Sequence, residues 1–339
     1  MQEIVVTRAA RCYGVAPAQL TPLDGGHFTH VYGFTRDGQE YVLRITPPNE
    51  EMDARSTLAY LEWMAFLADG GACVPRPSLS AEGRLLELIE GEDGSYIATV
   101  VEKARGVLGQ ELPLEQWTDA LYEQLGRVVG RMHALAGKYA PSDTTLRRPA
   151  WDQIGNCFHP GEPLEDAAVA ARREEVLRAA SALPTDAEGY GLIHADLHFA
   201  NLFVEPESGR ITVFDFDDCA YGWYAMDIAM GLFDILVLHP QEGRQAFAGR
   251  FLESYLRGYL AEKPLDVCWI ERLPLFLKLV ETGVYTQVYR YYDSQEPDAD
   301  PWVSSFMGGE PDRRARILGG VPYVELDWRG IWERAQSSL

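Results

Sequence analysis

An aspartate, an asparagine and a second aspartate follow one another in the second half of the chain at a spacing that suits phosphoryl transfer. The segment 194–201 reads His-Ala-Asp-Leu-His-Phe-Ala-Asn, and Asp215 follows fourteen residues later. Asp196 can orient an acceptor hydroxyl and accept its proton, and Asn201 and Asp215 can hold the magnesium ions that bridge the phosphates of ATP. We therefore predict that Asp196, Asn201 and Asp215 are catalytic, and that Asn201 and Asp215 are also metal ligands.

The surroundings of this motif support the prediction. The pattern H-x-D-L-x-x-x-N is that of the kinase catalytic loop, and Asp215 has the position of the aspartate in D-F-G. Apolar residues on either side predict short strands over 191–193, 201–204 and 210–216. This context puts Asp196 in a loop between strands and Asp215 near a strand end, as the motif requires. The alternative is a buried histidine with two capping carboxylates in an ordinary sheet.

Length and composition indicate a globular protein of the cytoplasm. The chain has 339 residues, 47% of them hydrophobic, which is enough for one large domain or two modest ones. No run of eighteen apolar residues is present, so no membrane span is expected, and the N-terminus does not resemble a signal peptide. The five cysteines are scattered and none forms C-x-x-C, which favours reduced thiols over a disulfide framework or a zinc site.

The charge of the chain excludes two classes of partner. A formal net charge of −21 repels nucleic acid and anionic membranes, so neither is expected to bind. The same charge could favour a cationic substrate. The simpler interpretation is that most of the acidic residues keep the protein soluble.

Two regions of different character predict an α+β fold with two lobes, like that of protein kinases. Residues 1–104 are expected to form a small antiparallel-sheet lobe that binds nucleotide, and residues 105–339 a larger, mainly helical lobe with the catalytic and acceptor-binding groups. The predicted hinge lies near 101–106. The elements that lead to this division are strands over 41–46, 84–90 and 96–102, and helices over 54–68, 117–135, 225–238, 245–260 and 269–292.

A glycine pair ahead of the strand over 41–46 is a candidate phosphate-covering loop. Gly25 and Gly26 lie between apolar runs, where backbone N–H groups can approach phosphate closely, and Thr29 follows them. An Asp-Gly pair is also common in hairpin turns, which is the alternative. We predict that Gly25, Gly26 and Thr29 contact the nucleotide.

Five further residues complete the predicted nucleotide site. Arg44 stands where kinases carry a lysine on the third strand, and Val42 shares its strand face because alternate residues point the same way. Glu62 on the following helix is the expected partner of Arg44, since arginine offers two parallel donors to a carboxylate. Val101 at the hinge and Phe203 after the catalytic loop are expected at the adenine ring. A surface arginine with a solvated glutamate, and a core role for Phe203, are the alternatives.

These residues together resemble the aminoglycoside phosphotransferase / choline kinase superfamily, which has a protein-kinase-like fold. The family hallmark H-G-D-L-H-x-x-N appears here as residues 194–201, and its I-D-F/W segment as 214–216. The likeness extends from about Leu20 to about Leu260 and is closest in look to the bacterial stress-response (RdoA-like) and spore-coat branches. It implies that His194 holds the loop and that Asp227 braces the loop backbone. Three departures are Arg44 for the commoner lysine, Ala195 for the usual glycine, which is expected to matter little, and the acidic pair of Asp217 and Asp218 after Phe216. Asp217 could assist metal binding, and a solvated or capping carboxylate is the simpler interpretation.

The sequence defines the phosphate acceptor less well than it defines the catalytic loop. Only eleven residues separate Asp215 from Asp227, which is too short for a long activation loop, so a small-molecule hydroxyl is the expected acceptor. A stress-response-type protein Ser/Thr kinase and a catalytically silent nucleotide-binding scaffold are the alternatives. An amine-bearing acceptor would suit an aromatic and acidic run, although a packed helix with a solvated loop is the simpler interpretation of that run. Its members are Tyr285, Tyr289, Tyr292, Asp293, Glu296, Asp298 and Asp300.

Overall fold

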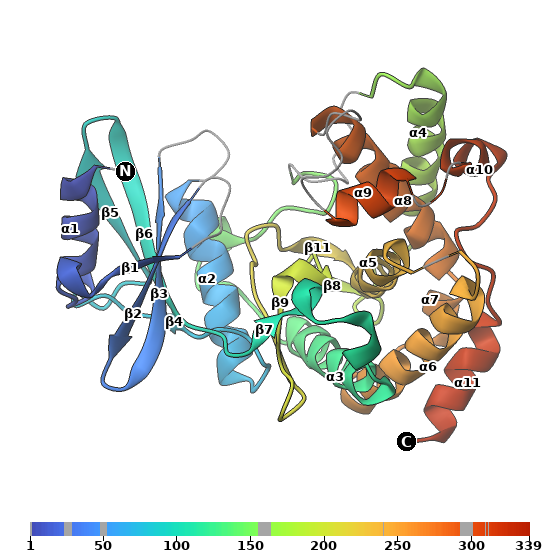
Figure 1. Ribbon diagram of the computed structural model, residues 1–339, viewed down its shortest axis with the longest axis horizontal. Helices are drawn as coiled ribbons and strands as arrows, with labels where there is room; N and C mark the ends of the chain where they lie inside the picture. Colours follow the sequence, from blue (N-terminus) through green and yellow to red (C-terminus); the bar gives the residue numbers. More distant parts are fainter. Residues whose placement is uncertain are drawn as a thin grey trace. The chain divides into compact units, whose positions relative to one another are not determined.

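The computed structural model describes residues 2–23, 29–47, 53–154, 164–239, 241–291, 301–308, 310 and 312–339. The described chain forms two compact units (Figure 1). The first contains Met1–Gly106, Tyr139–Arg148 and Thr212–Asp217, and the second contains Val107–Lys138, Pro149–Ile211 and Asp218–Leu339. The predicted loop residues Gly25 and Gly26, and Tyr292 with the acidic residues of 293–300, lie outside the described residues.

The first unit is built on an antiparallel sheet with the strand order β1-β2-β3-β6-β4, and β5 also pairs with β6. The turn between β2 and β3 is formed by Asp37 and Gly38, both with positive φ (53° and 79°). Two successive residues in this conformation match the right-handed twist of a hairpin. The strands are β1 (Thr21–Leu23), β2 (His30–Arg36), β3 (Gln39–Thr46), β4 (Pro77–Ser78), β5 (Leu86–Gly91) and β6 (Gly94–Glu102).

The two faces of this sheet have different partners. Helix α1 (Glu3–Cys12) lies on one side and α2 (Ala54–Asp69) on the other, as Figure 1 shows. Leu43, Ile45 and the other buried side chains of their strand face form one apolar cluster with α1. Because side chains alternate along a strand, Val42 and Arg44 point to the opposite face. This alternation directs the predicted nucleotide residues away from the α1 cluster.

The second unit is mainly helical, and its centre is α5, whose fourteen residues are all buried. Two small sheets accompany the helices, with the strand orders β10-β9-β7 and β11-β8. None of the described helices combines the length and the apolar character needed to cross a bilayer. The strands are β7 (Val107–Leu108), β8 (Tyr190–Ile193), β9 (Leu202–Glu205), β10 (Arg210–Val213) and β11 (Ala220–Trp223), and the helices are α3 (Asp119–Ala136), α4 (Ala167–Ser181), α5 (Tyr224–Val237), α6 (Arg244–Glu262), α7 (Val267–Ile270), α8 (Leu273–Tyr291), α9 (Pro301–Gly308), α10 (Arg313–Gly319) and α11 (Trp328–Ser337).

Helices α3 and α6 approach each other closely enough for their backbones to touch. A Cβ atom added to Gly126 on α3 would lie 1.9 Å from the carbonyl oxygen of Tyr255, and one added to Gly258 on α6 would lie 1.8 Å from that of Glu123. Only glycine leaves this space empty. The two glycines therefore set the separation of the helices that carry His133 and Tyr259, whose contacts are described below.

Three elements differ from those predicted. The predicted strand over 210–216 ends at Val213, so that Asp215 lies in coil beyond β10. The single helix predicted over 269–292 is two helices, α7 and α8, because Pro274 lacks an N–H and is tolerated only in the first turn of a new helix. Helix α1 is not among the predicted elements.

Candidate active site

A loop between β8 and β9 carries Asp196, and its backbone is fixed by a carboxylate from α5. Asp227 Oδ2 accepts a hydrogen bond from the N–H of His194 and Oδ1 accepts one from the N–H of Ala195, each at 2.9 Å. The brace expected of Asp227 is thereby confirmed. Ala195 has φ 65°, a left-handed conformation that strains any residue with a Cβ by about 1–2 kcal/mol. The glycine of the family would avoid this strain, so the departure matters more than the sequence indicated.

Asp227 is itself held by a buried histidine. His133 Nε2 on α3 lies 3.0 Å from Asp227 Oδ2, and its Nδ1 lies 2.9 Å from the hydroxyl of Tyr259 on α6. Since an ionised carboxylate only accepts, Nε2 donates to Asp227 and Nδ1 accepts from Tyr259. Burial lowers the pKa of His133 and outweighs the opposing effect of Asp227, which favours this neutral form. Three helices thus fix the catalytic loop.

A second aspartate of α5 holds the far end of the loop. Asp234 Oδ2 accepts a hydrogen bond of 2.8 Å from the N–H of Phe199, and burial raises the pKa of Asp234. Asp234 follows Asp227 by seven positions, about two helical turns, which puts both on one face of the helix. Sequence reasoning missed Asp234, and the available signal was two aspartates at this spacing in an otherwise apolar helix.

The carboxylate of Asp196 lies among three polar side chains of its own loop. His198 Nε2 lies 3.2 Å from Asp196 Oδ2, and Asn201 Nδ2 donates to the same oxygen at 3.0 Å. Burial opposes the ionisation of Asp196. The charge of His198 and its hydrogen bond favour ionisation, as do His194 and Asn201 to a smaller extent, and together they lower the pKa of Asp196 to about 2. Asp196 is therefore ionised and 36% exposed, as a group that orients a hydroxyl must be.

Asn201 is oriented by the same contacts. Its Nδ2 also donates to the backbone carbonyl of Asp196 at 3.0 Å, so its amide oxygen points away from that residue. An amide oxygen and a carboxylate are the donors that Mg²⁺ accepts in kinases, so the donor chemistry of Asn201, and separately that of Asp215, fits the metal. Among the described residues no group of three or more His, Cys, Asp or Glu side chains forms a metal site.

In the first unit, Arg44 is paired with the carboxylates that follow β10. Its Nη1 and Nη2 donate to the two oxygens of Asp217 at 3.1 and 2.6 Å, and Nη1 lies 3.6 Å from Asp215 Oδ1. The backbone of Asp215 has φ 66°, an uncommon conformation that occurs mostly at functional or turn positions. The side chain of Asp215 is 42% exposed.

The predicted ion pair between Arg44 and Glu62 is wrong. Glu62 accepts hydrogen bonds from Ser142, one from the N–H at 3.3 Å and a shorter one from the hydroxyl. The residue of α2 that contacts the Arg44 pair is Tyr60, which hydrogen-bonds to Asp217. Two residues correspond to 200° around a helix, so Glu62 points away from the side that Tyr60 occupies.

Val42 and Val101 face one another across the sheet. They are register partners of the β3–β6 pair, two residues along each strand from Arg44 and Thr99, and both are half-buried. Direct cross-strand partners have side chains on the same face, about 5 Å apart. Thr29, the residue before β2, is 9% exposed. The arrangement forms a small apolar surface beside Arg44, which an adenine ring requires.

Phe203 belongs to the second unit and pairs with Leu108 across β9 and β7. It is half-buried, whereas its neighbours Leu202 and Val204 are fully buried. Alternation along β9 thus directs Phe203 to the other face of its strand. Its predicted contact with adenine stays a prediction.

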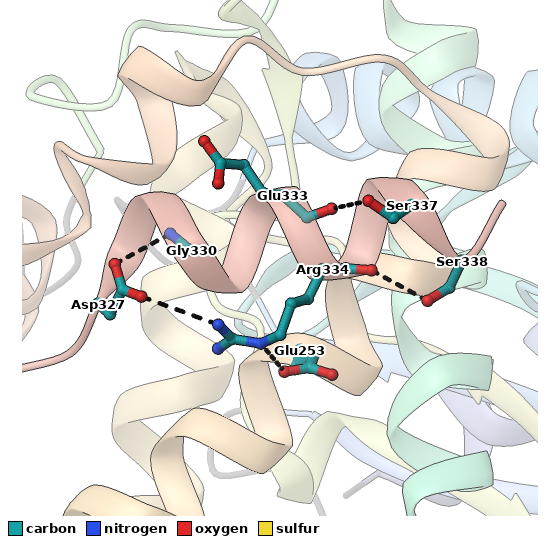
Figure 2. A pocket seen from close by; sticks show the side chains of 7 residues that line it. All are labelled: Glu253, Asp327, Gly330, Glu333, Arg334, Ser337 and Ser338. Carbon is teal, nitrogen blue, oxygen red and sulfur yellow. Dashed lines mark hydrogen bonds and ion pairs between the residues drawn. The ribbon is translucent and has the colours of Figure 1, made fainter.

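Described residues of the second unit line two hollows that bear on the acceptor prediction. One of about 650 Å³ is lined by Leu164, Glu165, Asp166, Tyr285, Tyr289 and Arg290. The other, of about 670 Å³, lies between α6 and α11 (Figure 2). There Arg334 bonds to Glu253 at 2.8 Å and lies 3.8 Å from Asp327, so these three charged side chains bind one another. Only the first hollow contains residues of the predicted acceptor run.

Comparisons with known proteins agree with this geometry. A model described as the phosphotransferase enzyme family matches residues 19–265. Amicoumacin kinase of Bacillus subtilis (strain 168) is 31% identical over 296 residues, which cover 86% of each chain. The structure of amicoumacin kinase hAmiN in complex with AMP-PNP, Ca²⁺ and Ami has a TM-score of 0.84 at 29% identity over 97% of each chain. A microcompartment-associated aminopropanol kinase has a TM-score of 0.71 at 22% identity, over 93% of this chain and 98% of its own, and shows a shared fold.

Proposed function

Because the chain belongs to the phosphotransferase enzyme family and is a kinase, we propose that it transfers the γ-phosphoryl group of ATP, with Mg²⁺, to a hydroxyl of an amine-bearing small molecule. The observation that carries the proposal is the ionised, half-exposed carboxylate of Asp196 on a loop whose backbone is fixed by Asp227. A proton acceptor on a rigid loop is what alcohol phosphorylation requires.

The roles of the loop residues follow from their chemistry. Asp196 orients the acceptor hydroxyl and takes its proton as the new bond from the acceptor oxygen to the γ-phosphorus forms and the bond from that phosphorus to ADP breaks, with ADP as the leaving group. Asn201 and Asp215 would provide oxygen ligands for Mg²⁺, and the bound ion would neutralise charge on the phosphates. The protein thereby contributes positioning and electrostatic stabilisation, with no covalent intermediate.

The nucleotide is proposed to bind on the Arg44 face of the first-unit sheet. Val42 and Val101 would contact adenine, and Arg44 would contact phosphate with donors that Asp217 does not use. Gly25, Gly26 and Thr29 remain our proposal for the loop over the phosphates, on the sequence grounds given above. Phe203 remains our proposal for a further adenine contact, on the sequence grounds given above.

For the acceptor, the hollow beside α8 is the favoured site. Tyr285 and Tyr289 lie with ring centroids 4.3 Å apart, and Tyr289 is 45% exposed. Glu165 lines the same hollow, and Asp166 there is occupied by an ion pair with Arg314 at 2.5 Å. Exposed aromatic faces next to a carboxylate bind ammonium groups. Aminopropanol, named for a structural neighbour, combines an amine with a hydroxyl.

Replacing Asp196 tests the central role. Asp196→Asn keeps the size of the side chain and removes the proton acceptor, so acceptor-dependent ADP release should fall by about 10²–10⁴-fold. The assay is a panel of amino alcohols, aminoglycosides and candidate proteins incubated with labelled ATP and Mg²⁺. AMP-PNP binding and the melting temperature serve as controls and should be retained. Turnover in Asp196→Asn equal to that of the wild type, or labelling of proteins alone, would refute the proposal.

The acceptor hollow is tested with a matched pair of variants. Tyr289→Ala removes the aromatic face and should raise the KM for an amine-bearing acceptor about tenfold, while Tyr289→Phe keeps the face and should change it little. The KM for ATP should stay constant in both. An unchanged acceptor KM in Tyr289→Ala would exclude this hollow as the amine site.

A further inference from the structure

The first unit holds a cluster of charged groups that differs from the usual kinase arrangement. In that arrangement a lysine on the third strand is paired with a glutamate on the following helix, and both must be in place for activity. Here the strand residue is Arg44. The only carboxylates on α2 are Glu62 and Asp69, which bind Ser142 and Arg76 respectively. No carboxylate of this helix is therefore available to position Arg44.

We propose that Asp217 is the residue that positions Arg44 for the nucleotide phosphates. This inference rests on the proposed function and names a carboxylate outside the usual kinase set. The two contacts of 3.1 and 2.6 Å make a bidentate pair, which fixes the plane of the guanidinium as well as its distance. Both side chains are 21% exposed, so the pair is largely withdrawn from solvent competition.

Asp217 is in turn held from two further sides. Its backbone carbonyl accepts a hydrogen bond of 2.5 Å from Arg148 Nη2, and Arg148 Nη1 donates to the hydroxyl of Ser56 at 2.6 Å. Arg148 is 6% exposed, and Ser56 belongs to the first turn of α2. The hydroxyl of Tyr60, also on α2, hydrogen-bonds to the Asp217 carboxylate. Helix α2 thus still supports the strand cation, through Asp217 and with no carboxylate of its own.

The chemistry of arginine makes this arrangement workable. A guanidinium has five N–H donors, and Asp217 engages one on each of two nitrogens. The remaining donors can bind phosphate while the pair with Asp217 persists. A lysine has one nitrogen and cannot make the bidentate contact, so Arg44 and Asp217 form a matched pair.

The experiment measures AMP-PNP affinity by calorimetry on the full chain, with Mg²⁺ and again with EDTA. Asp217→Asn should weaken binding about tenfold, because one charge-assisted pair is lost. Arg44→Lys should weaken binding similarly. Glu62→Gln and the matched control Asp69→Asn should stay within about twofold of the wild type. If Asp217→Asn proves unfolded by circular dichroism, Arg44→Lys and Glu62→Gln still decide the question.

A double-mutant cycle separates positioning from other roles. If Asp217 acts through Arg44, the Arg44→Ala/Asp217→Ala protein should bind no more weakly than Arg44→Ala alone. The loss in Asp217→Asn should also persist in EDTA. An additive double mutant, a loss seen only with Mg²⁺, or a Glu62→Gln loss equal to that of Asp217→Asn would overturn the inference. The AMP-PNP binding measurements involve no acceptor. A failed acceptor assay would therefore not affect the conclusion about Asp217 and Arg44.

Discussion

The ionisation of Asp196 is set by its neighbours rather than by its exposure. Burial disfavours the charged form, yet His198, His194 and Asn201 together hold the pKa of Asp196 at about 2. A group with this pKa is fully ionised throughout the physiological range. Protonation of Asp196 therefore cannot produce an acid limb in the activity profile between pH 5 and 8.

The same shift predicts a dependence of stability on pH. The folded-state pKa lies below the unfolded value of about 3.9, so ionised Asp196 favours the folded state above about pH 4 and loses this contribution as the pH falls toward about 2. The difference in free energy of unfolding between wild type and Asp196→Asn should therefore narrow on acidification. Urea unfolding between pH 6 and pH 3 measures it. A difference in free energy of unfolding that stays constant from pH 6 to pH 3 would contradict the lowered pKa of Asp196.

At single positions, sequence reasoning succeeded where spacing alone carries the information. The motif predicted a loop between two strands, and Asp196 lies between β8 and β9. Asp215 was predicted within the end of a strand over 210–216, and it lies two residues beyond β10. Sequence reasoning failed for Glu62, because the nearest acid on a helix can point the wrong way around the axis. The left-handed backbone of Ala195 has no signature in its own residue type.

At the level of elements, the approach of α3 and α6 determines where His133 and Tyr259 lie. Gly258→Ala inserts a methyl group 1.8 Å from a backbone oxygen, so the helices must separate. We expect a loss of about 1–3 kcal/mol in the free energy of unfolding and reduced turnover, since Tyr259 is the next residue.

A matched control lies on the same helix. A Cβ added to Gly249 meets no atom within 4 Å, so Gly249→Ala should stabilise by up to about 1 kcal/mol through helix propensity. Thermal or urea unfolding of both variants gives the comparison. Equal effects at the two glycines would show that propensity, and not helix separation, controls this position.

Element boundaries were predicted where the local pattern is strong. The helix over 54–68 and the paired strands over 84–90 and 96–102 appear as α2, β5 and β6 within two residues. The break between α7 and α8 was missed because the apolar pattern continues across it, while Pro274 starts a new helix. Pairing of β4 with β6 could not be foreseen, because a two-residue strand has no periodicity.

For the whole molecule, the α+β class and the kinase activity followed from the sequence, but the acceptor did not. The catalytic loop consists of a few adjacent residues, so its pattern is visible in the sequence. The acceptor hollow combines residues 164–166 with residues of α8, which lie more than a hundred positions further along the chain. Such a surface depends on tertiary packing. The net charge of −21 is compatible with a cationic acceptor. The Tyr289 variants described above test whether the hollow beside α8 binds such an acceptor.

The brace on the catalytic loop has a consequence for how the active enzyme is made. His133 precedes the loop in the chain, while Asp227 and Tyr259 follow it, so during synthesis the loop leaves the ribosome before two of the groups that shape it. Its geometry is completed only when α6 has been added and docked. Catalytic competence is thus a late product of folding, and a chain that ends before residue 259 lacks a part of its own active-site support.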